Sequence, residues 1–193
     1  MERIVNNARV FGLPQSVKAS KYPKAVDTEA CTADITDRVR HLAACEPGTG
    51  HDQFLTGIVV QFDLTFSIKA WTEAQRYHFL DFVSSQSTMH RITRFDLPAQ
   101  CNEYVHPAII GACESLIDQY QADPTPEGYL RVLYNIPTGF RLTARMTTNY
   151  RQLKTIYRQR REHRLPEWRE FCSWIETLPC SEFITGKRGA ESG

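Results

Sequence analysis

The stretch Gly57–Ile68, GIVVQFDLTFSI, carries the clearest structural signal in the chain. Every second residue of it is apolar: Ile58, Val60, Phe62, Leu64, Phe66 and Ile68. Successive side chains of a β-strand point to opposite faces, so this period of two predicts a strand with one face in the core. A second strand is predicted over Phe140–Met146, where Arg141, Thr143 and Arg145 form a basic outer face.

The other periodic segments have the spacing of helices. The predicted helices are Asp34–Cys45, Thr72–Phe82 with Thr72 as its cap, Pro107–Gln121, Pro126–Tyr134, Asn149–Arg161 and one that starts at Pro166. Trp71, Phe79 and Phe82 have helical spacing, which favours core positions over a stacking platform. A small sheet with several long helices indicates a mixed α/β fold. We expect one domain over residues 1–193, with a flexible tail from Gly186 onward.

The composition is that of a globular protein. The chain has 193 residues, 23 Lys+Arg, 22 Asp+Glu and a formal net charge of +1. Hydrophobic residues make up 41% and charged residues 23%. This balance excludes a globally basic nucleic-acid binder, an acidic solvating tail and a disordered chain. No apolar run approaches the roughly 20 residues of a membrane helix, and the start MERIVNN does not resemble a signal peptide. We therefore expect a cytoplasmic protein.

Metal binding is not expected from the cysteines or histidines. The six cysteines are Cys31, Cys45, Cys101, Cys113, Cys172 and Cys180. No two of them have the two-residue spacing of a zinc or redox pair, so we predict free, buried thiols. The six histidines are scattered and form no metal-binding pattern.

The predicted helix Asn149–Arg161 has an arginine on an apolar stripe. Eleven residues at about 100° each return to nearly the same azimuth, so Asn149 and Arg160 share a face, about 16 Å apart along the axis. Leu153 and Ile156 lie between them. An arginine on such a stripe needs an anionic or planar partner, or it reaches past Ile156 to solvent. Arg160 therefore either binds a ligand or is a solvated surface residue.

Two further features have open interpretations. Arg158, Arg160, Arg161, His163 and Arg164 form a basic run. Without interleaved aromatic residues, a solvated helix end that complements the helix dipole is favoured over a nucleic-acid surface. His51 and His78 are candidates for ligand binding or acid–base catalysis, and equally for structural or solvent-facing roles.

The C-terminal third of the chain resembles a known family. Thr147–Leu153 (TTNYRQL), then Arg160, then Glu167–Glu170 (EWRE) resemble the last block of the flavin-dependent thymidylate synthases. That block reads Asn-x-Arg-x-Leu, with a second arginine eleven residues after the Asn and then a tryptophan next to a glutamate. The Asn, both arginines and the Leu match at the same spacing.

The resemblance extends upstream. Gly50–Asp52 (GHD), ahead of the first predicted strand, is similar to the family's Gly-His-Glu. Arg76–His78 (RYH) falls where the family signature begins with Arg-His-Arg, and Ser85–His90 (SQSTMH) matches its continuation with one inserted residue. Arg131 is similar to the family's arginine before a short apolar run, and Ala8–Val10 resembles its early Ala-Arg-Val. Together the matches touch most of the chain.

The resemblance implies a ligand set and an assembly. Family members are homotetramers that bind FAD and dUMP at subunit interfaces, methylate dUMP with methylenetetrahydrofolate, and reduce the intermediate with flavin hydride. The implied cofactor-binding residues are His51, Gln53, His78, Asn149, Arg151 and Thr155, although the family prefers Asn at the last position. The implied nucleotide-binding residues are Arg76, Ser85, Gln86, Ser87, Arg131 and Arg160. Arg160 is also the implied catalytic residue, because its fork would bond the uracil edge while its charge stabilises the ionised base.

The chain also departs from the family signature at several positions. His78 stands where the signature has its second arginine, Ser84 or Ser85 stands for its Glu, and Met89-His90 stands for its final Arg-Tyr. Three hypotheses follow. The chain is a flavin-dependent enzyme, or a non-catalytic protein on the same scaffold that sequesters a nucleotide or nucleotide signal, or an interaction protein whose arginines only pack subunits together.

Overall fold

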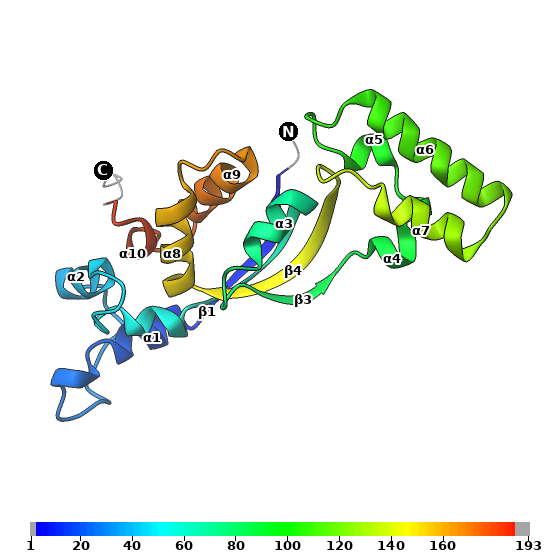
Figure 1. The fold of residues 1–193 in the computed structure, drawn as a ribbon. Coiled ribbons are helices and arrows are strands. Elements are labelled where there is room, and N and C mark those ends of the chain that lie inside the picture. Colours follow the sequence, from blue (N-terminus) through cyan, green and yellow to red (C-terminus); the bar gives the residue numbers. More distant parts are fainter. Residues whose placement is uncertain (1–2, 188–193) are drawn as a thin grey trace. The chain divides into compact units, whose positions relative to one another are not determined.

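A computed structural model describes residues 3–187. Its sheet has four strands: β1 (Val5–Phe11), β2 (Val59–Ser67), β3 (Asp81–Ser85) and β4 (Arg141–Asn149), in the order β1-β2-β4-β3 (Figure 1). The hydroxyls of Thr65 and Thr143 lie 2.8 Å apart, and Arg145 Nη1 lies 3.2 Å from Asp63 Oδ1. From the first pair to the second, the residue number falls by two on β2 and rises by two on β4. The two central strands are therefore antiparallel. The predicted mixed α/β fold with a small sheet is confirmed.

The helices alternate irregularly with the strands. They are α1 (Leu13–Ala19), α2 (Asp37–Ala44), α3 (Ile68–Ala74), α4 (Thr88–Arg91), α5 (Leu97–Gln100), α6 (Pro107–Ala122), α7 (Pro126–Tyr134), α8 (Tyr150–Arg160), α9 (Pro166–Ile175) and α10 (Glu182–Thr185). Short 3-10 turns are η1 (Tyr22–Lys24), η2 (Gln53–Gly57) and η3 (Ile92–Arg94). Within the described residues the chain packs as two compact units. The first comprises residues 3–63, Tyr77–Val83 and residues 145–187, and the second Leu64–Arg76 and Ser84–Ala144.

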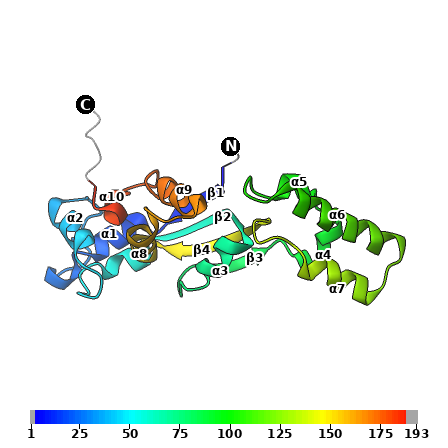
Figure 2. The same cartoon turned by 45° about the horizontal axis from the view of Figure 1, so that its top comes forward.

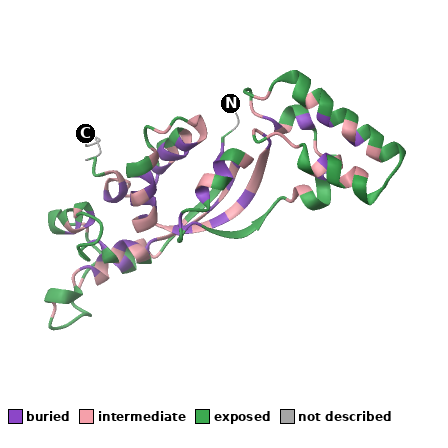
Figure 3. Ribbon diagram, viewed as in Figure 1, coloured by how far each residue is buried: buried purple, intermediate pink, exposed green. Residues whose placement is uncertain are grey.

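The first unit has an aromatic core between its part of the sheet and the C-terminal helices. On β2 the side chains alternate between half-buried and buried, as the sequence predicts. Phe62 is fully buried and packs against Phe171 and Trp174 of α9, with ring centroids 5.7 and 4.7 Å apart. On α8, Leu153 and Ile156 are fully buried, so the predicted apolar stripe of this helix is confirmed (Figure 3).

The second unit has a separate core beneath the helix pair α6 and α7, which lie side by side in Figures 1 and 2. Its buried members are Ile92, Leu97, Cys101, Cys113, Ile117, Val132 and Phe140. Trp71 is also buried in this unit, and its indole N–H donates to the Leu142 carbonyl at 3.1 Å. The predicted core position of Trp71 is therefore confirmed.

The prediction of a helix over Thr72–Phe82 was wrong. The helix α3 begins at Ile68, because the Ser67 hydroxyl caps it by accepting a bond from the Ala70 N–H at 3.2 Å. It ends at Ala74. The chain then turns and enters strand β3, whose five residues are all exposed. Phe79 and Phe82 are 61% and 49% exposed, so their expected core positions were also wrong.

The other predicted elements are present, the helix Pro126–Tyr134 with the predicted bounds and most of the others with shifted ends. The strand predicted at Gly57–Ile68 is β2, which starts two residues later and ends one residue earlier than predicted. The strand predicted at Phe140–Met146 is β4, which continues to Asn149. Strand β1 was not predicted, because its residues are mostly exposed and show no alternation. Between β1 and α1, Gly12 has φ +75°, and a Cβ there would collide with the Gly57 carbonyl oxygen. A glycine is therefore required at this turn.

Two expectations can be compared with the described residues. No helix among them has the length and apolar character needed to cross a bilayer. All six cysteines are free, but only Cys101, Cys113 and Cys172 are buried, whereas Cys31, Cys45 and Cys180 are half-buried. The expected flexible tail lies mostly outside the described residues.

Candidate functional site

Asn149 lies at the junction of β4 and α8, where it ends the strand and caps the helix. Its side-chain Oδ1 accepts a bond from the Gln152 N–H at 2.9 Å. The next backbone N–H, that of Tyr150, donates to the Ile58 carbonyl at 3.0 Å and so fixes the helix start against the residue before β2. Asn149 is therefore the N-cap rather than the first helical residue, and its amide nitrogen remains a candidate donor.

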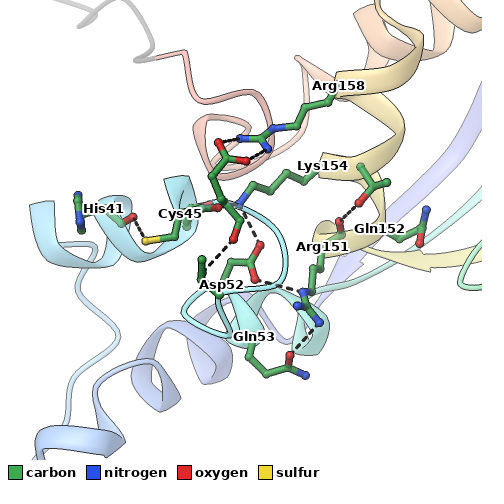
Figure 4. A network of polar contacts seen from close by, with 12 residues as sticks. His41, Cys45, Asp52, Gln53, Arg151, Gln152, Lys154 and Arg158 are labelled. Atoms are coloured by element: carbon green, nitrogen blue, oxygen red, sulfur yellow. Dashed lines mark hydrogen bonds and ion pairs between the residues drawn. The ribbon is translucent and has the colours of Figure 1, made fainter.

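Arg151, on the first turn of α8, is held by two side chains from the segment that precedes β2 (Figure 4). Its Nε donates to Asp52 Oδ1 at 3.2 Å, and its Nη1 donates to Gln53 Oε1 at 2.8 Å. Thr155, one turn along α8, donates its hydroxyl to the Arg151 carbonyl at 3.4 Å. The structure thus brings together three residues of the predicted cofactor set, Gln53, Arg151 and Thr155.

Lys154 completes this network from the next position on the same helix face (Figure 4). Its Nζ lies 3.0 Å from Asp52 Oδ2 and donates to the carbonyls of Ala43 and Cys45 at 2.6 and 2.5 Å. Those carbonyls belong to the C-terminal end of α2, the pole of a helix that favours a cation. Asp52 is fully buried and the Lys154 side chain is only 3% exposed, so this ion pair lies in the interior.

A second ion pair lies on the outside of the same helix. Arg158 Nη1 and Nη2 donate to the two oxygens of Glu46 at 2.8 and 3.3 Å. The hydrogen bond from Arg158 is the main reason that the pKa of the Glu46 carboxyl lies below its usual value. Both side chains are well exposed, at 41% and 76%, so this pair contributes little to stability.

Arg160 is half-buried and lies between aromatic rings of its own chain. Its guanidinium carbon lies 4.9 Å from the Trp168 ring centroid and 5.6 Å from that of Tyr77. Its Nε donates to the Tyr77 hydroxyl at 2.8 Å, and that hydroxyl bonds Gln159 at 2.9 Å. Arg160 Nη1 lies 2.7 Å from His163 Nε2. The partner that an arginine on an apolar stripe needs is therefore supplied, at least in part, by planar aromatic side chains.

The remaining predicted residues divide between the two units. His51 and His78 are exposed residues of the first unit. In the second unit Arg76, Ser85, Gln86 and Arg131 are exposed and Ser87 is half-buried. Two of these are engaged with neighbours.

Gln86 pairs with Thr143, and Arg131 with Glu127. The Gln86 side-chain oxygen accepts from the Thr143 N–H at 2.9 Å, so Gln86 extends the ladder of β4. Arg131 Nη2 bonds Glu127 Oε1 at 2.7 Å, one turn away on α7.

Thiol and phenol groups in the interior are held in their protonated forms. Burial raises the pKa of Cys101, Cys113 and Cys180, and raises that of Cys172 to about 12. Burial also raises the pKa of the Tyr150 hydroxyl, which donates to the Pro179 carbonyl. A nucleophilic cysteine needs a lowered pKa, so none of these four thiols has the character of a nucleophile. No group of His, Cys, Asp and Glu within residues 3–187 has an arrangement that could hold a metal ion.

Three residues of the site were not predicted from the sequence: Asp52, Lys154 and Tyr77. A signal for the first two was present, since Arg151 and Lys154 lie three residues apart and so share a helix face. Two cations on a partly buried face require an anion, and Asp52 stood in the Gly50–Asp52 motif. Tyr77 gave no such signal, because its contact with Arg160 depends on the turn between α3 and β3.

Comparisons with known proteins identify the fold. No family model matches the chain, and no curated protein sequence is a recognisable relative. Among solved structures, a flavin-dependent thymidylate synthase, ThyX, from Helicobacter pylori, complexed with FAD and dUMP, has a TM-score of 0.73 at 15% identity. That match covers 96% of this chain and 97% of the other.

Two further structures are similar. A second structure of ThyX from Helicobacter pylori, also with FAD and dUMP, has a TM-score of 0.69 at 12% identity over 92% of this chain and 93% of that one. The UMP/dUMP methylase PolB from Streptomyces cacaoi, bound with 5-Br dUMP, has a TM-score of 0.64 at 16% identity. That match covers 94% of this chain and 93% of the other. At these identities the likeness is one of fold, and the chain has the fold of the flavin-dependent thymidylate synthases.

Proposed function

We propose that the chain is a flavin-dependent uridine-nucleotide methylating enzyme, which binds FAD and dUMP and adds a one-carbon unit at C5 of the uracil. The observation that carries this proposal is the fold match over more than nine tenths of the chain to three structures. Each of the three holds dUMP or its 5-bromo analogue. A shared fold does not by itself imply a shared function, so the residues must also suit the ligands.

The residues that the resemblance implies for cofactor binding all belong to the first unit, and their donor chemistry suits FAD. A guanidinium has five N–H donors. Arg151 uses two of them, on Asp52 and Gln53, and its side chain is 31% exposed, so the remaining donors are open to a ligand. Asn149 uses its Oδ1 as the acceptor that caps the helix, and its amide nitrogen remains a candidate donor to a ligand. His51, Gln53 and His78 are exposed polar groups. We propose that these five residues, with Thr155, hold FAD.

The proposed nucleotide contacts are Arg160 in the first unit and Arg76, Arg131, Ser85, Gln86 and Ser87 in the second. The resemblance implies sites shared between subunits, so the two sets need not meet within one chain. Arg160 is held in one orientation by Tyr77 and Trp168, so little rotamer entropy is lost when its guanidinium binds a planar base. Its positive charge would stabilise negative charge that develops on the uracil. The serine hydroxyls would donate to the phosphate.

Bound FAD would supply the hydride that reduces the one-carbon unit to a methyl group. The protein's own residues then have three tasks: Arg151 and Asn149 orient the cofactor, Arg160 binds the ionised base edge, and the serines fix the phosphate. We further propose a homotetramer, as the resemblance implies.

A second candidate is a nucleotide-binding protein without catalysis. The observation that favours it is that Arg131 and Gln86, two predicted nucleotide contacts, already bond neighbours within the chain. In addition His78, Met89 and His90 replace charged or aromatic residues of the family signature. Such a protein would bind dUMP or a related nucleotide and take up no flavin.

Calorimetric titration of FAD and dUMP into the purified chain tests both candidates. The proposed enzyme binds FAD, becomes yellow, and binds dUMP in the FAD-loaded form. The second candidate binds dUMP and stays colourless. A chain that binds neither ligand contradicts both candidates and favours the third hypothesis, an interaction protein. In that case neither FAD nor dUMP should change the melting temperature of the chain.

A further inference from the structure

The carboxylate of Asp52 is bound by two cations inside the first unit. The residue is fully buried, Oδ1 accepts from Arg151 Nε at 3.2 Å, and Oδ2 lies 3.0 Å from Lys154 Nζ (Figure 4). Taking a carboxylate out of water is costly unless it is paired and hydrogen-bonded. One anion between two cations leaves the three side chains with a net positive charge.

Lys154 directs all of its donors inward. An ammonium has three N–H donors. Its three acceptors are Asp52 Oδ2 and the carbonyls of Ala43 and Cys45 at the end of α2. With 3% of its side chain exposed, Lys154 has no donor left for a ligand. Its effect is to fix the Asp52 carboxylate.

Arg151 is arranged in the opposite way. Its side chain is 31% exposed, and three of its five N–H donors have no partner among residues 3–187. Its orientation is nevertheless set, because Asp52 holds Nε and Gln53 Oε1 holds Nη1. A guanidinium that is fixed in place and still has donors is preorganised to bind an oxygen acceptor.

We propose that Asp52, fixed by Lys154, is a positioning residue that presents the Arg151 guanidinium to an oxygen acceptor of FAD. The acceptor is either a diphosphate oxygen or a carbonyl of the flavin ring, since both take a charge-assisted N–H bond. This inference rests on the proposed function, and it adds two buried residues that themselves touch no ligand.

The test is a double-mutant cycle read out as FAD affinity. Asp52→Asn retains the size and one acceptor oxygen but removes the charge that holds Arg151. We expect it to weaken FAD binding by about 10- to 100-fold, by analogy with the loss caused by removing an outer partner of a metal-ligating residue. Arg151→Gln should cause a similar loss. Because Asp52 acts through Arg151, adding Asp52→Asn to Arg151→Gln should weaken binding no further.

Two further variants keep the test interpretable. Asp52→Asn leaves Lys154 as a buried cation without its carboxylate, which can destabilise the fold. The double variant Asp52→Asn/Lys154→Met removes both charges, and it should fold and show the same loss of FAD affinity. Glu46→Gln breaks the exposed ion pair with Arg158 on the same helix and is the matched control. It should bind FAD as the wild type does.

Titrations with FAD, FMN and riboflavin identify the acceptor. If the effect of Asp52→Asn disappears with riboflavin, which has no phosphate, Arg151 binds a phosphate oxygen; if it persists, Arg151 binds the ring. Both results support the inference. A folded Asp52→Asn/Lys154→Met variant with wild-type FAD affinity overturns it and leaves the proposed function intact, as do fully additive losses in the cycle. A wild-type chain that takes up no FAD overturns the proposed function and the inference together.

Discussion

Arg160 is the residue on which the nucleotide proposal depends most. Its contacts with Tyr77 and Trp168 fix the guanidinium, and a fixed arginine can serve either packing or recognition. Arg160→Ala should weaken dUMP binding by about 2–5 kcal/mol if the contact with the nucleotide is buried and charge-assisted. Calorimetry on the FAD-loaded wild type and variant measures the difference. Equal affinities would mean that Arg160 only packs against the two rings.

Asp63 gives a prediction about pH. Its carboxylate accepts from Asn7 Nδ2 at 2.6 Å and from Arg145 Nη1 at 3.2 Å, and so links β1, β2 and β4. The hydrogen bond from Asn7 and the interaction with Arg145 hold the pKa of Asp63 below its usual value, although burial opposes them. A lowered folded-state pKa adds stability above the unfolded pKa of about 3.9, and that stability is lost as the pH falls through the folded-state pKa.

Asp63→Asn should therefore lower the free energy of unfolding by about 1–2 kcal/mol at pH 7. The gap to the wild type should shrink as the pH falls below about 4, because the Asp63 carboxylate of the unfolded wild type then takes up a proton, and it should close as the pH passes through the lowered pKa of the folded state. Urea unfolding of the wild type and of Asp63→Asn at several pH values measures this difference in the free energy of unfolding. A gap that stays constant down to pH 3 would show that the charge of Asp63 is not what stabilises the strands.

At the scale of elements, Asn149 has two roles that can be separated. As the N-cap of α8 it uses Oδ1, and as a proposed flavin contact it would use Nδ2. Asn149→Asp keeps the capping oxygen and should unfold as the wild type does, whereas Asn149→Ala should lose about 0.5–2 kcal/mol. Only the amide can donate, so both variants should bind FAD more weakly. If Asn149→Asp binds FAD normally, Asn149 is a cap and nothing more.

The elements also show how far the sequence predicts this fold. Strand β2 was predicted because one of its faces is buried and its apolar residues alternate. Strands β1 and β3 lie at the edges of the sheet and are mostly exposed, so neither needs an alternating pattern. The predicted start of α3 was wrong because its N-cap, Ser67, lies within the alternating sequence pattern and is also the last residue of strand β2.

The candidate site was predictable where a motif was local and not where contacts are distant. Asn149, Arg151 and Arg160 belong to one local block that resembles the family's last motif, and helix spacing alone places Asn149 and Arg160 on one face. The Asp52–Lys154 pair joins residues 102 apart, and the Tyr77–Arg160 bond joins residues 83 apart. Hydrophobic periodicity carries no information about which distant polar residues meet, so these partners needed the three-dimensional structure.

At the scale of the whole molecule, the proposal implies an assembly. The resemblance places FAD and dUMP at subunit interfaces, and the exposed edge strand β3 carries Phe82 and Val83, which are 49% and 58% exposed. A sheet edge with apolar side chains is usually covered in natural proteins. Mass measurement in solution should give a tetramer, or at least a dimer. A strict monomer at micromolar concentration would contradict a site built from several chains.

The reaction proposed for this chain is the methylation of a uridine nucleotide with the help of FAD. The most direct measurement is a single turnover of the FAD-loaded protein, chemically reduced and mixed with dUMP and methylenetetrahydrofolate, with the nucleotide product analysed by mass spectrometry. We expect dUMP to gain the mass of one methylene group while the flavin returns to its oxidised spectrum, and Arg160→Ala to give much less product. Unchanged dUMP, from a protein shown to hold reduced FAD and both substrates, would contradict the proposed reaction.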